Sequence, residues 1–113
     1  MQEVKAIIQP HMLSKVVRAL HALPHFPGCT VNDARGQGRG RGAGGSYKVT
    51  EDDIDYHRKV VLELVCSDHL VADITDTIRQ AAHTGHPGDG LIIVRDLREV
   101  IRIRTGERQD AAV

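Results

Sequence analysis

Residues 60–82 read VVLELVCSDHLVADITDTIRQAA, and this stretch decides the fold. Its first residues, 60–66, are apolar except for Glu63 and predict a strand. Ser67 is placed to begin a helix, and apolar residues then recur at helical spacing: Leu70, Ile74, Ile78 and Ala81. A strand that leads directly into an amphipathic helix is typical of an α+β domain in which helices cover one face of a sheet.

The beginning of the chain repeats this order. Residues 4–8 form a short run rich in β-branched residues that Pro10 ends, and apolar residues then follow at helical spacing: Met12, Leu13, Val16, Val17, Leu20 and Leu23. Two further strands are expected over 29–34 and 91–94. The order strand, helix, strand, strand, helix, strand predicts a ferredoxin-like βαββαβ fold with both helices on one face of an antiparallel sheet. The second face needs a cover, for which another copy of the chain is the simplest candidate.

Composition excludes several classes of protein. The 113 residues suit one domain, 1–113, whose core must be packed from Val, Ile, Leu and Ala because the chain has no Trp, one Phe and two Tyr. Lys plus Arg and Asp plus Glu both number 15, so no overall field attracts nucleic acid or an anionic membrane. The apolar run near the amino terminus is too short for a signal peptide or a membrane span, so we expect a cytoplasmic protein that is not embedded in a membrane.

A long loop is expected between the second and third strands, over residues 36–58. Its first ten positions contain six glycines, accompanied by Arg35, Arg39 and Arg41. Glycines let backbone amides approach an anion that the arginines would attract, although a solvated hairpin tip fits the same composition. Loops of this length within an ordered domain usually have a function.

Two other segments are candidates to meet the same anion. The glycine-rich residues 85–90 join the second helix to the fourth strand, either as a phosphate-facing bend or as an ordinary turn. Arg102 and Arg104 are expected on one side of an extended segment, because alternate strand residues share a face. Arginine suits bidentate contact with phosphate, whereas pairing with Glu99 or Glu107 would make the two arginines purely structural.

Three segments together resemble the P-II signal transduction family: VKAIIQPHMLSKVVRAL at 4–20, TGHPGDG at 84–90 and IRIRTGE at 101–107. The resemblance covers essentially the whole chain. It implies a non-catalytic regulatory protein, a homotrimer of ferredoxin-like subunits in which ATP and ADP compete for clefts between subunits. It also implies that 36–58 is the T-loop, which docks onto target proteins, that 84–90 is the B-loop, and that 101–113 is a C-terminal strand and tail.

The resemblance implies roles for individual residues. The nucleotide-binding residues would be Ile7, Gly28, Cys29, Thr30, Gly36, Gln37, Gly38, Arg39, Gly40, Glu63, Val65, Thr84, Gly88, Asp89, Gly90, Arg102 and Arg104. The partner-binding loop would present Arg41, Tyr47, Lys48, Asp52 and Tyr56. Thr30, Glu63 and Val65 would line the adenine pocket, and Arg102 and Arg104 would hold the phosphate charge. No metal ligand and no catalytic residue is expected.

Departures from the family pattern change the expected ligands. Gly40 stands where the family has a Gln that helps to hold Mg²⁺ and 2-oxoglutarate, so a small anion such as bicarbonate is the expected co-ligand. Asp52 stands where the family has the uridylylated Tyr. Leu91 replaces a phosphate-contacting Lys or Arg, so ADP and AMP are expected to compete well with ATP. The target, an unidentified protein or membrane transporter, is expected to differ as well.

Two alternative functions stay open at this point. A metal- or redox-responsive sensor would use pairs of histidines or cysteines: His21 with His25, His83 with His86, and Cys29 with Cys66 if a hairpin sets the two cysteines opposite each other. A nucleic-acid binder would use the Gly/Arg alternation, but four acidic residues follow at 51–55 and aromatic residues are scarce. Thiol counting with and without an oxidant tests the first alternative, and salt-dependent RNA binding tests the second.

Overall fold

The computed structural model describes residues 1–37 and 56–113. These residues form strands and α-helices in the following order: β1 (Gln2–Ile8), α1 (Leu13–His21), β2 (Thr30–Gly36), β3 (His57–Cys66), α2 (Val71–Ala82) and β4 (Gly90–Asp96). Short 3-10 turns precede the helices at Pro10–Met12 and Asp68–Leu70, and another lies at Gln109–Ala112. The predicted order of strands and helices is confirmed.

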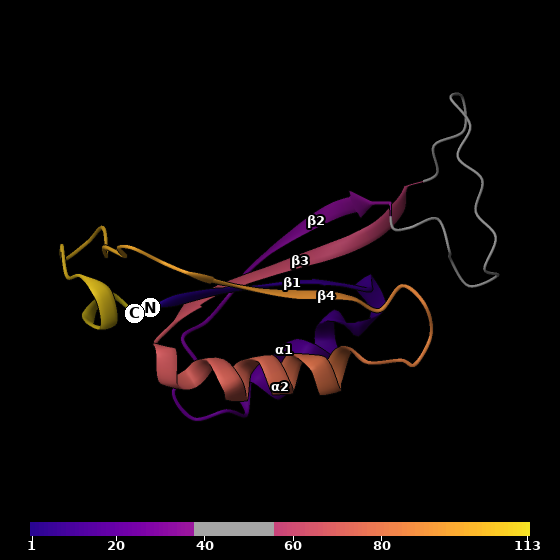
Figure 1. Ribbon diagram of the computed structural model, residues 1–113, viewed down its shortest axis with the longest axis horizontal. Coiled ribbons are helices and arrows are strands. Elements are labelled where there is room, and N and C mark those ends of the chain that lie inside the picture. The colour runs from indigo at the N-terminus through magenta and orange to yellow at the C-terminus, as the bar shows by residue number, and fades with distance from the viewer. Residues whose placement is uncertain (38–55) are drawn as a thin grey trace.

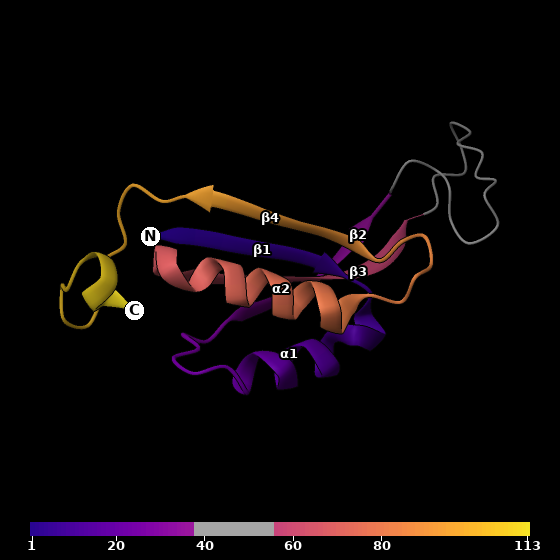
Figure 2. The same ribbon diagram turned by 60° about the horizontal axis from the view of Figure 1, so that its bottom comes forward.

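The strands form one sheet in the order β2-β3-β1-β4, and every neighbouring pair is antiparallel. At the centre of the sheet, Ala6 of β1 pairs with Leu62 of β3 on one side and with Ile92 of β4 on the other. Both helices cover the same face of the sheet (Figures 1 and 2). The α+β ferredoxin-like fold is therefore confirmed. In the described parts of the chain, no helix is long and apolar enough to cross a membrane.

The core lies between the sheet and the two helices. Because alternate strand residues face opposite sides, the even-numbered residues over 4–8 and 60–66 point toward the helices and are buried there. The buried core residues are Val4, Ala6, Ile8, Val16, Leu20, Val60, Leu62, Leu64, Cys66, Ile74, Ile78, Ala81 and Ala82. The odd-numbered residues of β1 and β3 face the other side, which we call the open face, and neither α1 nor α2 covers it.

The hairpin of β2 and β3 is longer than the sequence predicts. Its strands continue until Gly36 pairs with His57, so the predicted loop 36–58 begins after Gly36 and ends before His57. Arg35 pairs with Arg58 in this extension. Because both paired residues are charged, this part of the hairpin lacks the alternation of apolar and polar residues by which a strand is usually recognised.

The prediction of a strand at 101–104 was wrong, because the segment forms a tight turn. The Gly106 N–H donates to the Arg102 carbonyl at 2.8 Å, and the Arg102 N–H donates to the Glu107 carbonyl at 2.9 Å. Gly106 has a φ of +74°, which glycine adopts without strain. The amides of this segment therefore bond within the turn, which an isolated β-bridge closes, and not along the edge of the sheet.

The amino terminus forms an ion pair with the 3-10 turn that precedes α2. The Met1 ammonium donates to Asp68 Oδ1 at 2.8 Å. This hydrogen bond raises the pKa of the Met1 amino group above its ordinary 8.0 and lowers the pKa of Asp68 below its ordinary 3.8. The pair therefore stabilises the fold between those two pH values. Its contribution is lost as the pH rises through the raised pKa of Met1 or falls through the lowered pKa of Asp68.

Asp68→Asn should lower the midpoint of thermal unfolding at about pH 6, where both charges of this pair are present in the native chain. The difference from the native chain should shrink toward about pH 2 and toward about pH 10, because one partner then loses its charge. Scanning fluorimetry across this range checks the prediction. Asp76→Asn, which removes an exposed acid of α2, is the control. A difference in midpoint that is constant across the pH range contradicts the ion pair.

Candidate functional site

A groove lies at the end of the sheet where β2 begins and β3 ends. Its volume is about 520 Å³, which suits a small organic ligand. Predicted nucleotide-binding residues from distant parts of the chain line it: Gly28, Cys29, Thr30, Glu63, Val65 and Arg102. The fold thus brings these six residues together, and three of them, Thr30, Glu63 and Val65, are those that the resemblance assigns to the adenine pocket.

The register of the sheet sets the polar side of the groove. Thr30 pairs with Glu63 across the hairpin, and Glu63 lies on the open face. The Lys5 ammonium lies 3.7 Å from the Glu63 carboxylate. In the same way, Arg95 of β4 donates to the Glu3 carboxylate at 2.5 Å. Both carboxylates therefore lie at the groove, where they can accept hydrogen bonds from the hydroxyl and amino groups of a ligand.

Of the two predicted phosphate-binding arginines, only Arg102 lines the groove. Arg104 lies in the turn, and the two do not share the face that a strand would have given them. Among the described residues, no acidic side chain pairs with either guanidinium, and Glu99, a predicted partner, pairs with Arg108 instead. Arg102 therefore brings a positive charge to the groove that no acid of the described chain neutralises.

A second cluster of predicted residues lies in the bend over 84–90, between α2 and β4. The Asp89 carboxylate accepts hydrogen bonds from the Thr84 N–H at 2.8 Å, from the Thr84 hydroxyl, and from the Gly85 N–H at 3.1 Å. These bonds lower the pKa of Asp89, and the bond from the Thr84 hydroxyl contributes most. The His86 N–H donates to the Thr84 hydroxyl oxygen. The amides left to meet an anion are those of Gly88 and Asp89, because Pro87 has none.

The bend is fixed to the ends of the strands. Gly90 has a φ of +110°, and a Cβ there would lie 1.7 Å from the Ile7 carbonyl oxygen, so only glycine fits. Gly88 has a φ of +95°. Its carbonyl oxygen accepts one hydrogen bond from Gln9 Nε2 at 2.7 Å and one from Lys59 Nζ at 2.8 Å. Ile7, another predicted nucleotide-binding residue, thus lies next to the bend.

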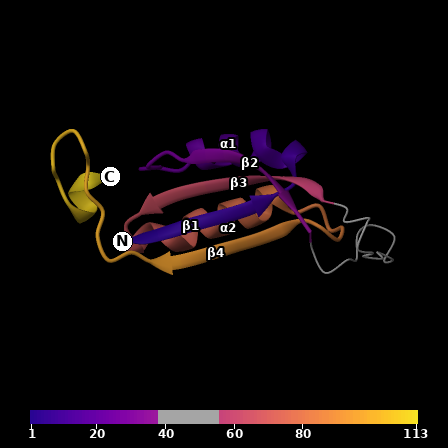
Figure 3. The same cartoon turned by 90° about the horizontal axis from the view of Figure 1, so that it is seen from above.

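The groove and the bend lie at opposite ends of the sheet, as Figure 3 shows for the carboxyl-terminal segment and the α2–β4 connection. Strand β1 has 7 residues, so at about 3.3 Å per residue the two ends are roughly 20 Å apart. Gly36 and Gln37 belong to the bend end, where β2 leaves the sheet. A single chain therefore cannot place Arg102 and the glycine bend around one pyrophosphate.

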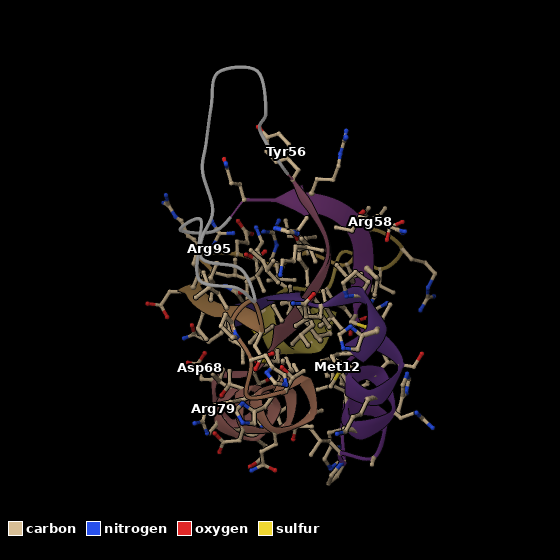
Figure 4. All side chains as sticks on the ribbon, turned by 90° about the vertical axis from the view of Figure 1, so that its right-hand side faces the viewer. Met12, Tyr56, Arg58, Asp68, Arg79 and Arg95 are labelled. Atoms are coloured by element: carbon tan, nitrogen blue, oxygen red, sulfur yellow. The ribbon has the colours of Figure 1, made fainter. Side chains whose placement is uncertain are left out.

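Some predicted residues lie outside the described residues: Gly38, Arg39 and Gly40 of the nucleotide-binding set, and Arg41, Tyr47, Lys48 and Asp52 of the partner-binding set. Tyr56, the remaining member of the partner-binding set, lies just before β3 (Figure 4). It is 54% exposed. Tyr56 is therefore accessible to a partner at the base of the loop.

The register contradicts the cysteine pairing considered above. Thr30 pairs with Glu63. The register continued by one residue sets Cys29 opposite Leu64, not opposite Cys66, and both thiols are free. Burial raises the pKa of each thiol, which lowers its reactivity. Among the described residues, no group of three or more His, Cys, Asp or Glu side chains is placed to hold a metal ion.

Sequence patterns do not predict every residue at the two ends of the sheet. Glu3 and Val113 line the groove, and Gln9 and Lys59 contact the bend. A signal for Lys59 exists, because the alternation of β3 sets it on the same face as Glu63. The same alternation in β1 sets Glu3 on this face. For Gln9 and Val113 no local pattern exists, since their positions depend on neighbours that are distant in sequence.

Comparisons with known proteins decide the family. The family model described as Nitrogen regulatory protein P-II matches residues 1–107. The chain belongs to the P-II family. It is 43% identical over 113 residues to the nitrogen regulatory protein P-II of Azospirillum brasilense and 44% identical over 113 residues to that of Rhodospirillum rubrum, with 100% of each chain covered. It is also 43% identical, again over 113 residues and 100% of each chain, to nitrogen regulatory protein P-II 1 of Escherichia coli strain K12.

Membership confirms the resemblance from which the site residues were carried over. The P-II match includes the quoted segments at 4–20, 84–90 and 101–107. P-II proteins are regulatory signal transducers and not catalysts. The chain is thus a signalling protein of this family, even though its loop is rich in glycine and arginine.

Proposed function

We propose that this P-II protein is a homotrimer that binds adenine nucleotides between subunits, where the groove of one subunit meets the glycine bend of the next. The observation that carries the proposal is the position of Arg102. Its guanidinium, which pairs with no acid in residues 1–37 or 56–113, lies at the groove, roughly 20 Å from the Gly88 and Asp89 amides at the other end of the sheet. Both groups suit phosphate, and two chains can bring together what one chain keeps apart.

The open face of the sheet supports assembly. Val61, Ile7 and Leu91 are aligned in one row across β3, β1 and β4. Leu91 is 66% exposed, and Ile93, two residues further along β4, is 37% exposed. An exposed apolar patch of this kind is typical of a protein–protein contact. Further copies of the same chain would cover it with closed symmetry.

The proposed ligands follow from the chemistry at the two ends. At the groove, the Thr30 hydroxyl and the Glu63 carboxylate suit a nucleoside, beside the apolar Val65. ADP and AMP compete well with ATP in this proposal because Leu91, next to the bend, offers no cation for a third phosphate. Bicarbonate is the proposed co-ligand.

The T-loop is the proposed output of the binding site. A bound nucleotide would shift the populations of loop conformations, and one of these would be recognised by a target protein or a membrane transporter in the cytoplasm. Such a mechanism needs differential binding to two conformations and no catalytic residue.

Titration calorimetry with ATP, ADP and AMP, each alone and with bicarbonate, 2-oxoglutarate or Mg²⁺, tests the proposal. Saturable heat is expected for all three nucleotides, with ADP and AMP within about tenfold of ATP. A chain that gives no heat with any of them is not a nucleotide sensor. Light scattering tests the assembly, which should weigh about 37 kDa as three chains of 12.4 kDa.

Leu91→Lys should raise the affinity for ATP by about tenfold and the affinity for AMP much less. The new ammonium would lie beside the bend, where a charge-assisted contact contributes about 1.5 kcal/mol to binding. Calorimetry on the native and variant chains measures the ratio of the two affinities. Ala72→Lys adds the same charge on the exposed surface of α2, away from the open face, and is the control. Equal gains for ATP and AMP contradict a phosphate contact at this position.

A further inference from the structure

The segment that carries Arg102 is a closed loop whose two legs are hydrogen-bonded to each other. We define this carboxyl-terminal loop as residues 98–109, which follow β4 and project beyond the end of the sheet (Figure 3). Ile101 of the first leg forms an isolated antiparallel bridge with Arg108 of the second leg. Val100 and Arg102, alternate residues of the first leg, both line the groove. The conformation of the first leg therefore decides where the Arg102 guanidinium lies.

Gln109 joins the two legs at the base of the loop. Its N–H donates to the Val100 carbonyl at 2.9 Å, and its side-chain Oε1 accepts from the Val100 N–H at 3.3 Å. Its side-chain Nε2 donates to the Arg98 carbonyl at 3.1 Å. The side-chain amide thus supplies an acceptor and a donor to the backbone of the first leg, as a paired strand residue would. These bonds fix the first leg at two positions just before Arg102.

The backbone of Gln109 adopts a conformation that needs support from its contacts. Its φ is +55°, in the left-handed region that residues other than Gly, Asn and Asp seldom adopt. Such a conformation costs free energy and persists only where the surrounding structure holds it. The chain turns at this residue from the second leg into the 3-10 turn Gln109–Ala112. Gln109 therefore closes the loop and also redirects the chain toward the domain.

The residues after Gln109 anchor the loop on the domain. The Ser67 hydroxyl, just after β3, donates to Asp110 Oδ1 at 2.8 Å. Ala112 is only 6% exposed, and it lines the groove together with Val113. Gln109 therefore connects this buried anchor to the leg that carries Arg102.

A second side-chain contact between the legs is weaker. Glu99 and Arg108 form an ion pair, and both side chains are largely exposed to solvent. An exposed pair of this kind contributes little to stability. The hydrogen bonds of the Gln109 side chain are therefore the stronger side-chain restraint on the first leg.

We propose that Gln109 is the positioning residue that holds Arg102 at the groove. The inference rests on the proposed nucleotide function and adds how its phosphate contact is built: the side-chain amide fixes the first leg, and the fixed leg keeps the guanidinium at the groove. A group that is already in place loses less entropy on binding than a mobile one. Loss of the amide should therefore weaken nucleotide binding, although Gln109 itself does not line the groove.

Gln109→Gly tests the side chain, because glycine adopts the same φ without strain. In titration calorimetry this variant should bind ADP about tenfold more weakly than the native chain, and adenosine, which has no phosphate, about equally. The Val100 amide, whose acceptor is lost, should exchange its hydrogen faster. Gln109→Ala loses the same amide with a less flexible backbone and should bind ADP at least as weakly. Gln80→Ala, on the exposed surface of α2, is the control and should bind like the native chain.

A double variant asks whether Gln109 acts through Arg102. In a chain that already carries Arg102→Ala, adding Gln109→Gly should lower the affinity for ADP by no more than about twofold. Independent contributions would multiply, and the double variant would then bind about tenfold more weakly than Arg102→Ala alone.

The outcomes distinguish this inference from the proposed function. If the native chain gives no heat with any nucleotide, the proposed function fails and the positioning role fails with it. If Arg102→Ala weakens ADP binding but Gln109→Gly and Gln109→Ala bind like the native chain, the positioning role alone is wrong. It is also wrong if the losses of the double variant multiply, or if Gln109→Gly loses adenosine to the same extent as ADP.

Discussion

Arg102→Ala is expected to weaken the binding of ATP and ADP by about tenfold to a hundredfold. The Arg102 guanidinium lines the groove, and no acid in the described chain neutralises it, so it is free to bind phosphate. A hydrogen bond to a charged group contributes about 1.5–3 kcal/mol, which corresponds to this loss of affinity. Calorimetry measures it, and the loss should be larger for nucleotides than for adenosine, which has no phosphate.

The control for this prediction is Arg98→Ala, which removes an exposed arginine from the segment that follows β4. Arg98 does not line the groove, so the affinity for nucleotide should stay unchanged. Arg104→Ala tests the second predicted arginine, which lies in the turn and not at the groove. If Arg102→Ala binds ADP as tightly as the native chain, the groove is not a phosphate site.

Val61→Glu should convert the proposed trimer into monomers and abolish nucleotide binding in the same step. Val61 lies in the apolar row of the open face, and a carboxylate buried there without a partner costs several kcal/mol in each subunit. The monomers should keep their fold, because the side chain of Val61 points away from the helices. Light scattering should show about 12.4 kDa in place of about 37 kDa.

Ala72→Glu is the control for this prediction, since it places the same charge on the exposed surface of α2, on the opposite side of the sheet. This variant should remain a trimer and bind nucleotide. Circular dichroism should give the same spectrum for both variants. A monomeric Val61→Glu chain that still binds ADP at native affinity would show that one subunit holds a complete site.

The order of strands and helices could be predicted because each element has a clear apolar period. Residues 60–66 are apolar except for Glu63, and α2 repeats its apolar residues at helical spacing. The ends of the hairpin could not be predicted, since Arg35 pairs with Arg58 and charged residues carry no apolar pattern. Ser67 was also misjudged: its hydroxyl donates to Asp110 and does not cap the helix.

The site could be predicted only in part, and for a physical reason. The glycines of the bend predict a backbone with positive φ angles, and Gly88 and Gly90 have them. At Gly90 the structure requires glycine, because no Cβ fits there. The carboxyl-terminal turn was expected to be a strand because Ile and Arg alternate there, but Gly106 lets the chain fold back on itself. The separation of Arg102 from the bend follows from sheet topology, which no local pattern contains.

Because the groove and the bend lie at opposite ends of one chain, genetic defects in them should complement each other in the proposed trimer. A chain damaged at the groove and a chain damaged at the bend are each inactive alone. In a mixed ring, one junction always joins an intact groove to an intact bend. A ring with two chains of one kind and one of the other therefore has one working site, whichever kind is in excess. An allele that is inactive alone can then be active beside a second inactive allele.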